Sequence, residues 1–124
     1  MEELKISPTR KTPEILLMPE GIIRIKGRSI PEDVSDFFQP VEDWVTEYIV
    51  SPAEETTVDM SFEYFNSASA KAFIQLLQKI TSVKSKHKKY ILNWFYEDGD
   101  DDILERGEYF SSVLNVPFNF IMIK

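Results

Sequence analysis

Within one short stretch of this chain, the apolar residues change from the spacing of a strand to the spacing of a helix. Over residues 56–65 every second side chain is apolar, at Val58, Met60, Phe62 and Tyr64. From residue 70 apolar side chains recur every three or four positions, at Ala70, Phe73, Leu76, Leu77, Ile80 and Val83. The first spacing predicts a strand with one buried face, and the second predicts an amphipathic helix. The sequence therefore favours an α/β fold built from strand–helix units.

The same two spacings recur along the rest of the chain. They predict helices over residues 30–50 and 103–114, and strands over residues 15–18, 22–26, 90–96 and 118–123. Pro19, Glu20 and Gly21 predict a hairpin turn between the first two strands. Pro40 lies inside the first helical stripe and predicts a kink or a break there. The order ββαβαβαβ favours a mixed sheet with parallel pairs, packed against three helices that can share one face.

The length and composition fit one folded domain. With 124 residues, of which 43% are hydrophobic, the chain can bury a core but is too short for two ordinary domains. We predict that residues 15–124 form a single domain. Residues 1–14 are polar and include Pro8 and Pro13, so we expect them to form a flexible N-terminal arm.

Charge and cysteine content narrow the classes of partner. A net charge of −7 disfavours a nucleic-acid or anionic-membrane surface, because phosphate groups are bound mainly by clustered Lys and Arg. The lack of cysteine excludes disulfides and thiolate metal sites. No run of residues has the apolar core of a signal peptide or the length of a membrane span. We therefore expect a cytoplasmic protein that binds no nucleic acid and does not insert into a membrane.

An acidic loop at residues 97–102 is the strongest charge feature. Asp98, Asp100 and Asp102 alternate as they would in a calcium loop. However, Ile103 stands where an EF-hand needs glycine, and Tyr109 stands where it needs the closing glutamate. Acidic residues at a helix start also complement the helix dipole. A solvated helix cap is the favoured interpretation, and the three aspartates are kept as candidate ligands for a divalent ion.

The other candidates for chemistry favour structural interpretations. His87, the single histidine, lies in the lysine-rich loop 84–89 and has no local carboxylate to orient it as a general base. The four glycines are too far apart to form a phosphate-cradling loop. We therefore expect no cofactor and no catalytic residues, which argues against an enzyme.

The junction between strand and helix, Asn66 to Ser69, offers hydroxyls at a helix start. Asn66 is a good N-cap, and serines in a first turn are common. The structural interpretation is that Ser67 and Ser69 only occupy this turn. The functional interpretation is a phosphoacceptor, since the free N–H groups and dipole of a helix start tolerate a phosphate. Both interpretations stay open on the residues alone.

Six segments, in order, resemble the SiaC family of bacterial regulatory phosphoproteins, and the match runs from about residue 12 to the C-terminus. They are Thr12 to Ile15, Ile30 to Glu32, Gln39 to Trp44, Tyr64 to Lys71, Asn93 to Tyr96 and Val116 to Phe118. The resemblance implies a STAS-like architecture, similar to that of the anti-sigma-factor antagonists. It also implies phosphorylation at the start of the helix that follows a central strand.

Carried onto this chain, the resemblance places the acceptor at Ser67, with Ser69 as the alternative. It implies two partners, a GHKL-type Ser/Thr kinase that adds the phosphate and a PP2C-type phosphatase that removes it. The unmodified protein would bind and activate a diguanylate cyclase, which links the switch to cyclic-di-GMP and biofilm formation. Tyr64 and Lys71, on either side of the acceptor, are candidates for the partner surface.

Two alternatives compete with this hypothesis. The first keeps the fold and the phosphoacceptor but makes the chain an anti-anti-sigma-like partner switch that acts on a sigma-regulating kinase. The second is a small divalent-metal-dependent enzyme that uses the aspartates of the acidic loop. No nucleophile or general base accompanies those acids, so we rank the enzyme last.

Overall fold

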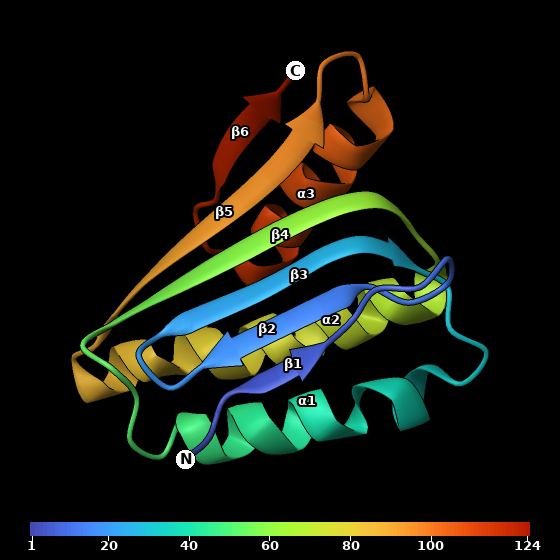
Figure 1. The fold of residues 1–124 in the computed structure, drawn as a ribbon. Helices are drawn as coiled ribbons and strands as arrows, with labels where there is room; N and C mark the ends of the chain where they lie inside the picture. Colours follow the sequence, from blue (N-terminus) through green and yellow to red (C-terminus); the bar gives the residue numbers. More distant parts are fainter.

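Six strands form one mixed sheet in which the spatial order follows the order along the chain (Figure 1). In this computed structural model, which describes residues 1–124, the strands are β1 (Leu4–Ile6), β2 (Glu14–Met18), β3 (Ile22–Ser29), β4 (Glu55–Phe65), β5 (Lys89–Glu97) and β6 (Asn119–Ile123). The helices are α1 (Val34–Tyr48), α2 (Ser67–Thr81), the short 3-10 helix η1 (Ser82–Lys86) and α3 (Asp101–Leu114). The predicted mixed α/β fold is confirmed. None of the helices combines the length and apolarity needed to span a bilayer.

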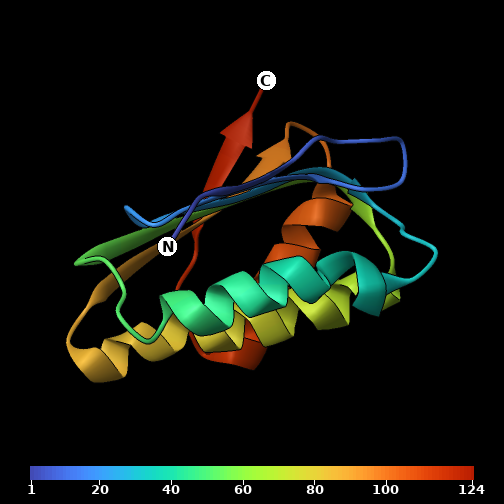
Figure 2. The same ribbon diagram turned by 60° about the horizontal axis from the view of Figure 1, so that its bottom comes forward.

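The pairing explains why the helices share one face. β1, β2 and β3 pair antiparallel, and the predicted hairpin turn joins β2 to β3. β3 to β6 are all parallel, and each is connected to its neighbour through one of the helices. Crossovers of one hand that advance in one direction along a sheet place every helix on the same side. Figure 2 shows α1, α2 and α3 below the sheet, with the opposite face left open.

The open face carries a row of polar side chains across four strands. Arg24 on β3, Asp59 on β4, Asn93 on β5 and Asn119 on β6 stand opposite one another in the sheet register. Asn93 donates to Asp59 at 2.9 Å, Asn119 donates to Asn93 at 3.1 Å, and Arg24 lies 4.0 Å from Asp59. The alternating positions on β3, β4 and β5 point toward the helices and form the core, whereas β6 is exposed along its whole length.

An aromatic cluster fills the space between the sheet and α2 and α3. Phe65, Phe73 and Trp94 are fully buried. The Phe65 ring contacts the rings of Phe73, Trp94 and Phe110, and Trp94 also contacts Phe110, at centroid distances between 5.3 and 6.1 Å. α3 approaches the sheet closely at Gly107, where an added Cβ would lie 2.5 Å from Trp94 Nε1. In the same contact Trp94 Nε1 donates to the Ile103 carbonyl at 3.0 Å. Gly107 therefore sets the position of α3.

In the N-terminal half, part of the expected arm belongs to the sheet, and of the two outcomes expected at Pro40 the break does not occur. The arm at residues 1–14 contains β1, whose Leu4 and Ile6 pack against the core and pair with β2. Trp44 also donates to the carbonyl of Glu2 at 2.8 Å. Pro40 does not split α1, which runs continuously through it. Pro40 lies on the exposed side of the helix, where water can satisfy the carbonyl that it leaves unpaired.

Candidate functional site

The predicted junction lies where β4 passes into α2. Asn66 has an extended backbone, and its Oδ1 accepts from the backbone N–H of Ser69 at 2.9 Å. Asn66 is thus the N-cap of α2, which begins at Ser67, three residues earlier than the apolar spacing predicted. The side-chain cap of this helix therefore comes from Asn66 and not from a serine hydroxyl.

The two candidate serines have different environments. Ser69 is fully buried, and its hydroxyl lies 2.8 Å from the hydroxyl of Ser29 and donates to the Ser29 carbonyl at 2.9 Å. It joins the start of α2 to the end of β3. Ser67 is exposed, and its hydroxyl makes no hydrogen bond within the chain. A kinase needs a reachable hydroxyl, so this geometry favours Ser67 over the alternative acceptor Ser69.

Ser67 lines a shallow hollow between the start of α2 and one side of α3. The hollow is formed by Ser67, Ala70, Asp102, Glu105, Arg106, Tyr109 and Phe110. Arg106 holds the junction from α3, because its Nη1 donates to the Phe65 carbonyl at 2.6 Å. Its guanidinium also covers the Phe65 ring, with 3.7 Å between Cζ and the ring centroid. The acceptor candidate therefore faces one basic and two acidic side chains.

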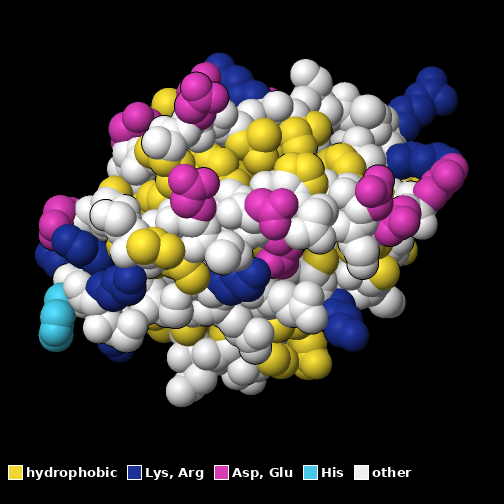
Figure 3. Space-filling view, turned by 90° about the horizontal axis from the view of Figure 1, so that it is seen from below, with side chains coloured by type: hydrophobic (Ala, Val, Ile, Leu, Met, Phe, Trp, Pro, Cys, Tyr) yellow, Lys and Arg dark blue, Asp and Glu magenta, His cyan; other side chains and the backbone are white.

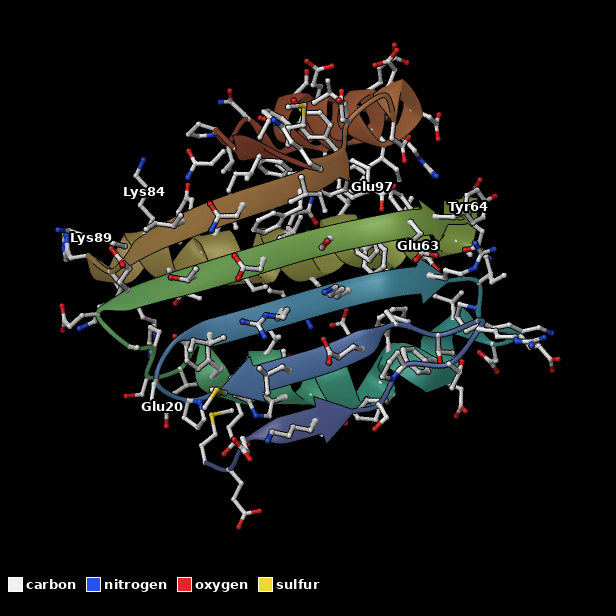
Figure 4. The ribbon with its side chains drawn as sticks, turned by 45° about the horizontal axis from the view of Figure 1, so that its top comes forward. Glu20, Glu63, Tyr64, Lys84, Lys89 and Glu97 are labelled. Carbon is white, nitrogen blue, oxygen red and sulfur yellow. The ribbon has the colours of Figure 1, made fainter.

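The two candidate partner residues lie on different sides of Ser67. Tyr64 is 43% exposed, and the guanidinium of Arg28 lies 5.9 Å from its ring centroid. Figure 4 shows Glu63, Tyr64 and Glu97 at the same end of the sheet. Lys71, also exposed, is one turn further along α2 and lines the groove between α1 and α2. The structure does not bring Tyr64 or Lys71 into the hollow with Ser67.

The groove between α1 and α2 is wider than the hollow and is lined by polar and charged side chains from both helices. Lys79 of α2 pairs with Glu42 of α1 across it and also donates to Thr46 at 3.1 Å. Figure 3 views the molecule from the α1 side and shows acidic side chains across this face, with the histidine at one end among basic ones. The basic loop and the candidate acceptor are therefore separated along the molecule.

The three aspartates of the acidic loop are not gathered into one cluster. Asp100 caps α3, since its Oδ1 accepts from the backbone N–H of Ile103 at 3.1 Å. Asp98 is exposed in the turn before it, and Asp102 faces the hollow beside Ser67. Nowhere do three or more acidic or histidine side chains come close enough together to hold a metal ion. The structure therefore supports the helix-cap interpretation of this loop.

Arg106 is the residue of this site that the sequence pattern did not reveal. It is far from Ser67 in the chain, and no local motif marks it. Its position depends on how closely α3 packs on the sheet, which Gly107 and Trp94 determine. Gly107 next to an arginine in an apolar helical stripe was the one available signal.

Known proteins resemble this chain over nearly its whole length. A model of the SiaC family of regulatory phosphoproteins matches residues 6–123. An uncharacterised protein of Pseudomonas aeruginosa strain UCBPP-PA14 is 27% identical over 119 residues, which is 95% of this chain and 94% of that protein. The solved structure of SiaC of Pseudomonas aeruginosa is 26% identical and matches with a TM-score of 0.83, covering 100% of this chain and 98% of the other.

A second solved structure contains SiaC with a partner. It is the complex of the diguanylate cyclase SiaD with its activator SiaC, both of Pseudomonas aeruginosa. It matches with a TM-score of 0.82 at 25% identity and covers 96% of this chain and 97% of the other. Because the family model matches nearly the whole chain, this protein belongs to the SiaC family of regulatory phosphoproteins.

Proposed function

We propose that this chain regulates a diguanylate cyclase and that phosphorylation of Ser67 controls the regulation. The observation that carries the proposal is the solved complex in which SiaC, 25% identical and alike in fold, is the activator of SiaD. On this proposal the chain acts by binding and has no catalytic site of its own. Tyr64 and Lys71 contribute to the partner surface around Ser67.

The geometry of Ser67 supports its role as acceptor. Its hydroxyl is exposed and free, while Asn66 already caps the helix. In the transfer, the γ-phosphoryl group of ATP passes to Ser67 Oγ, ADP leaves, and the hydroxyl proton goes to a base of the kinase. The phosphate would then stand at the start of α2, where unpaired N–H groups and the helix dipole favour negative charge. The fold should therefore survive the modification.

The charge of the phosphate supplies the switch. A phosphoserine adds nearly two negative charges at neutral pH. On a partner surface, these charges weaken binding through desolvation and through repulsion from acidic groups. A GHKL-type kinase would release the cyclase in this way, and a PP2C-type phosphatase would restore the binding. Both reactions, the phosphorylation and the dephosphorylation, would take place in the cytoplasm, where ATP is available.

Phosphorylation is tested with the full chain, its cognate kinase and ATP. We expect one phosphate per chain, mapped to Ser67 by mass spectrometry, and no phosphate on Ser67→Ala. Ser85→Ala is the matched control, because Ser85 is also exposed but lies in η1 at the other end of α2. Labelling of Ser67→Ala equal to that of the wild type would refute Ser67 as the acceptor.

Regulation is tested by measuring cyclic-di-GMP synthesis by purified diguanylate cyclases of the source organism. We expect the unmodified chain and Ser67→Ala to activate one of them, and the phosphorylated chain to lose this effect. Equal activation by the phosphorylated and unmodified chains would rule out the switch. No effect on any cyclase would rule out the proposed target.

A further inference from the structure

Arg106 is the single basic side chain among the residues that line the hollow around Ser67. Its contacts within the chain are one hydrogen bond to the Phe65 carbonyl and the stacking of its guanidinium on the Phe65 ring. None of the ion pairs of the structure includes it. Its positive charge is therefore held against Phe65, which lies two residues before Ser67 in the chain, and it has no carboxylate partner.

We propose that Arg106 binds the phosphate of phosphorylated Ser67, an inference that rests on Ser67 being the acceptor. A guanidinium carries five N–H donors in a planar fork, and the Phe65 carbonyl occupies one of them. The remaining donors can meet two phosphate oxygens while the bond to Phe65 persists. Paired hydrogen bonds of this kind between arginine and phosphate are among the strong ones in proteins.

The other residues of the hollow make this pairing selective for the modified state. Asp102 and Glu105 are exposed and line the same hollow. Both carboxylates repel a dianion on Ser67. Arg106 is the one side chain of the hollow whose positive charge can offset this repulsion. Tyr109, also on α3, can add a hydroxyl donor.

The consequence concerns the position of α3. Arg106 belongs to α3, whereas Ser67 begins α2. A phosphate bound between them connects the two helices directly, in addition to the contact that Arg106 already makes with the end of β4. Phosphorylation would thus tighten α3 against the junction as well as change the surface charge.

The test follows the titration of the phosphoserine by ³¹P NMR in the full phosphorylated chain. With Arg106 as its partner, the phosphate should have a second pKa below the ordinary value of about 6. In Arg106→Gln this pKa should be higher than in the wild type by about one unit, since an opposite charge nearby favours the dianion. In Asp102→Asn the second pKa of the phosphate should be lower than in the wild type, because one repelling carboxylate is removed. Arg106→Lys, which keeps the charge but loses the fork, should lie between the wild type and Arg106→Gln.

The matched control is Arg28→Gln, which removes a positive charge near the end of β4 but outside the hollow. It should leave the titration unchanged. Amide hydrogen exchange should slow in α3 when the wild type is phosphorylated, and should not slow in Arg106→Gln.

The outcomes separate the two proposals. Stoichiometric phosphate on Ser67 with identical titrations in the wild type, Arg106→Gln and Arg106→Lys would overturn the role of Arg106 and leave the acceptor intact. Failure of the wild type to accept phosphate at Ser67 would overturn both. If Arg106→Gln does not fold, Arg106→Lys decides the question, because the pKa of the phosphate in that variant should still be higher than in the wild type.

Discussion

The two ends of the parallel strands differ in how their charged and polar side chains are used. At the amino end, Lys88 pairs with Glu54, and Lys86 donates to the Val50 carbonyl at 2.8 Å. At the carboxyl end, the hydroxyl of Ser67 has no partner and Arg106 has no carboxylate. Figure 4 shows Lys84 and Lys89 at one end of the sheet, and Tyr64 and Glu97 at the other.

The difference shows where the chain keeps groups available for a partner. In open α/β sheets, ligands commonly bind outside the carboxyl ends of the parallel strands, where the loops lead into helix starts. In this chain the carboxyl end combines such a helix start with the free Ser67 hydroxyl and with Arg106, whereas at the amino end Lys86 and Lys88 hold loops. Variants at the two ends should therefore have different consequences.

The largest effect on stability is expected from Gly107→Ala. The added Cβ would lie 2.5 Å from the buried Trp94 ring, so α3 must move away from the sheet. We expect a loss of about 1–3 kcal/mol in the free energy of unfolding, measured by urea denaturation. Arg106 should lose its contact with Phe65 in the same step. Glu108→Ala, exposed on the same helix, is the control and should change the stability little.

A smaller effect is expected from Asn66→Ala, which removes the N-cap at the carboxyl end. The cost should be about 1 kcal/mol, again read from urea denaturation. Ser82→Ala is the counterpart at the amino end, where the hydroxyl donates to the Lys79 carbonyl after α2 has ended. It should cost less than about 0.5 kcal/mol. Equal losses from the two variants would contradict the assignment of Asn66 as the cap.

The smallest effect on stability is expected from the ion pair of Glu54 at the amino end of the strands. A hydrogen bond and the positive charge from Lys88 hold the pKa of Glu54 below its ordinary value. A depressed carboxylate pKa stabilises the fold above the pKa of the unfolded chain, and this contribution is lost as the pH falls through the folded pKa. NMR titration should show the pKa of Glu54 rising in Lys88→Ala and unchanged in Lys84→Ala. A pKa that stays low without Lys88 would mean that another group causes the shift.

Local features of the sequence were enough to predict most of the fold and part of the site. The spacing of apolar residues locates β4 and α2, and the type of residue at Asn66 identifies the cap. β1 was missed because three residues carry too little periodicity to stand out, although Leu4 and Ile6 do alternate around Lys5.

The missing part of the site depends on contacts between distant segments. Ser69 is buried because the end of β3 lies beside the start of α2. There Ser29 forms hydrogen bonds with Ser69. The approach of Arg106 to Ser67 follows from the packing of α3 on Trp94. Neither contact leaves a periodic signal, since each joins single residues far apart in the chain.

The polar row on the open face of the sheet also protects the alignment of its strands. Asp59 lies between Val58 and Met60, both buried against the helices. Because side chains alternate, a slip of one residue in β4 would turn these two toward water and Asp59 into the core. It would also separate Asp59 from Arg24 and Asn93. The row thus penalises mispaired sheets during folding.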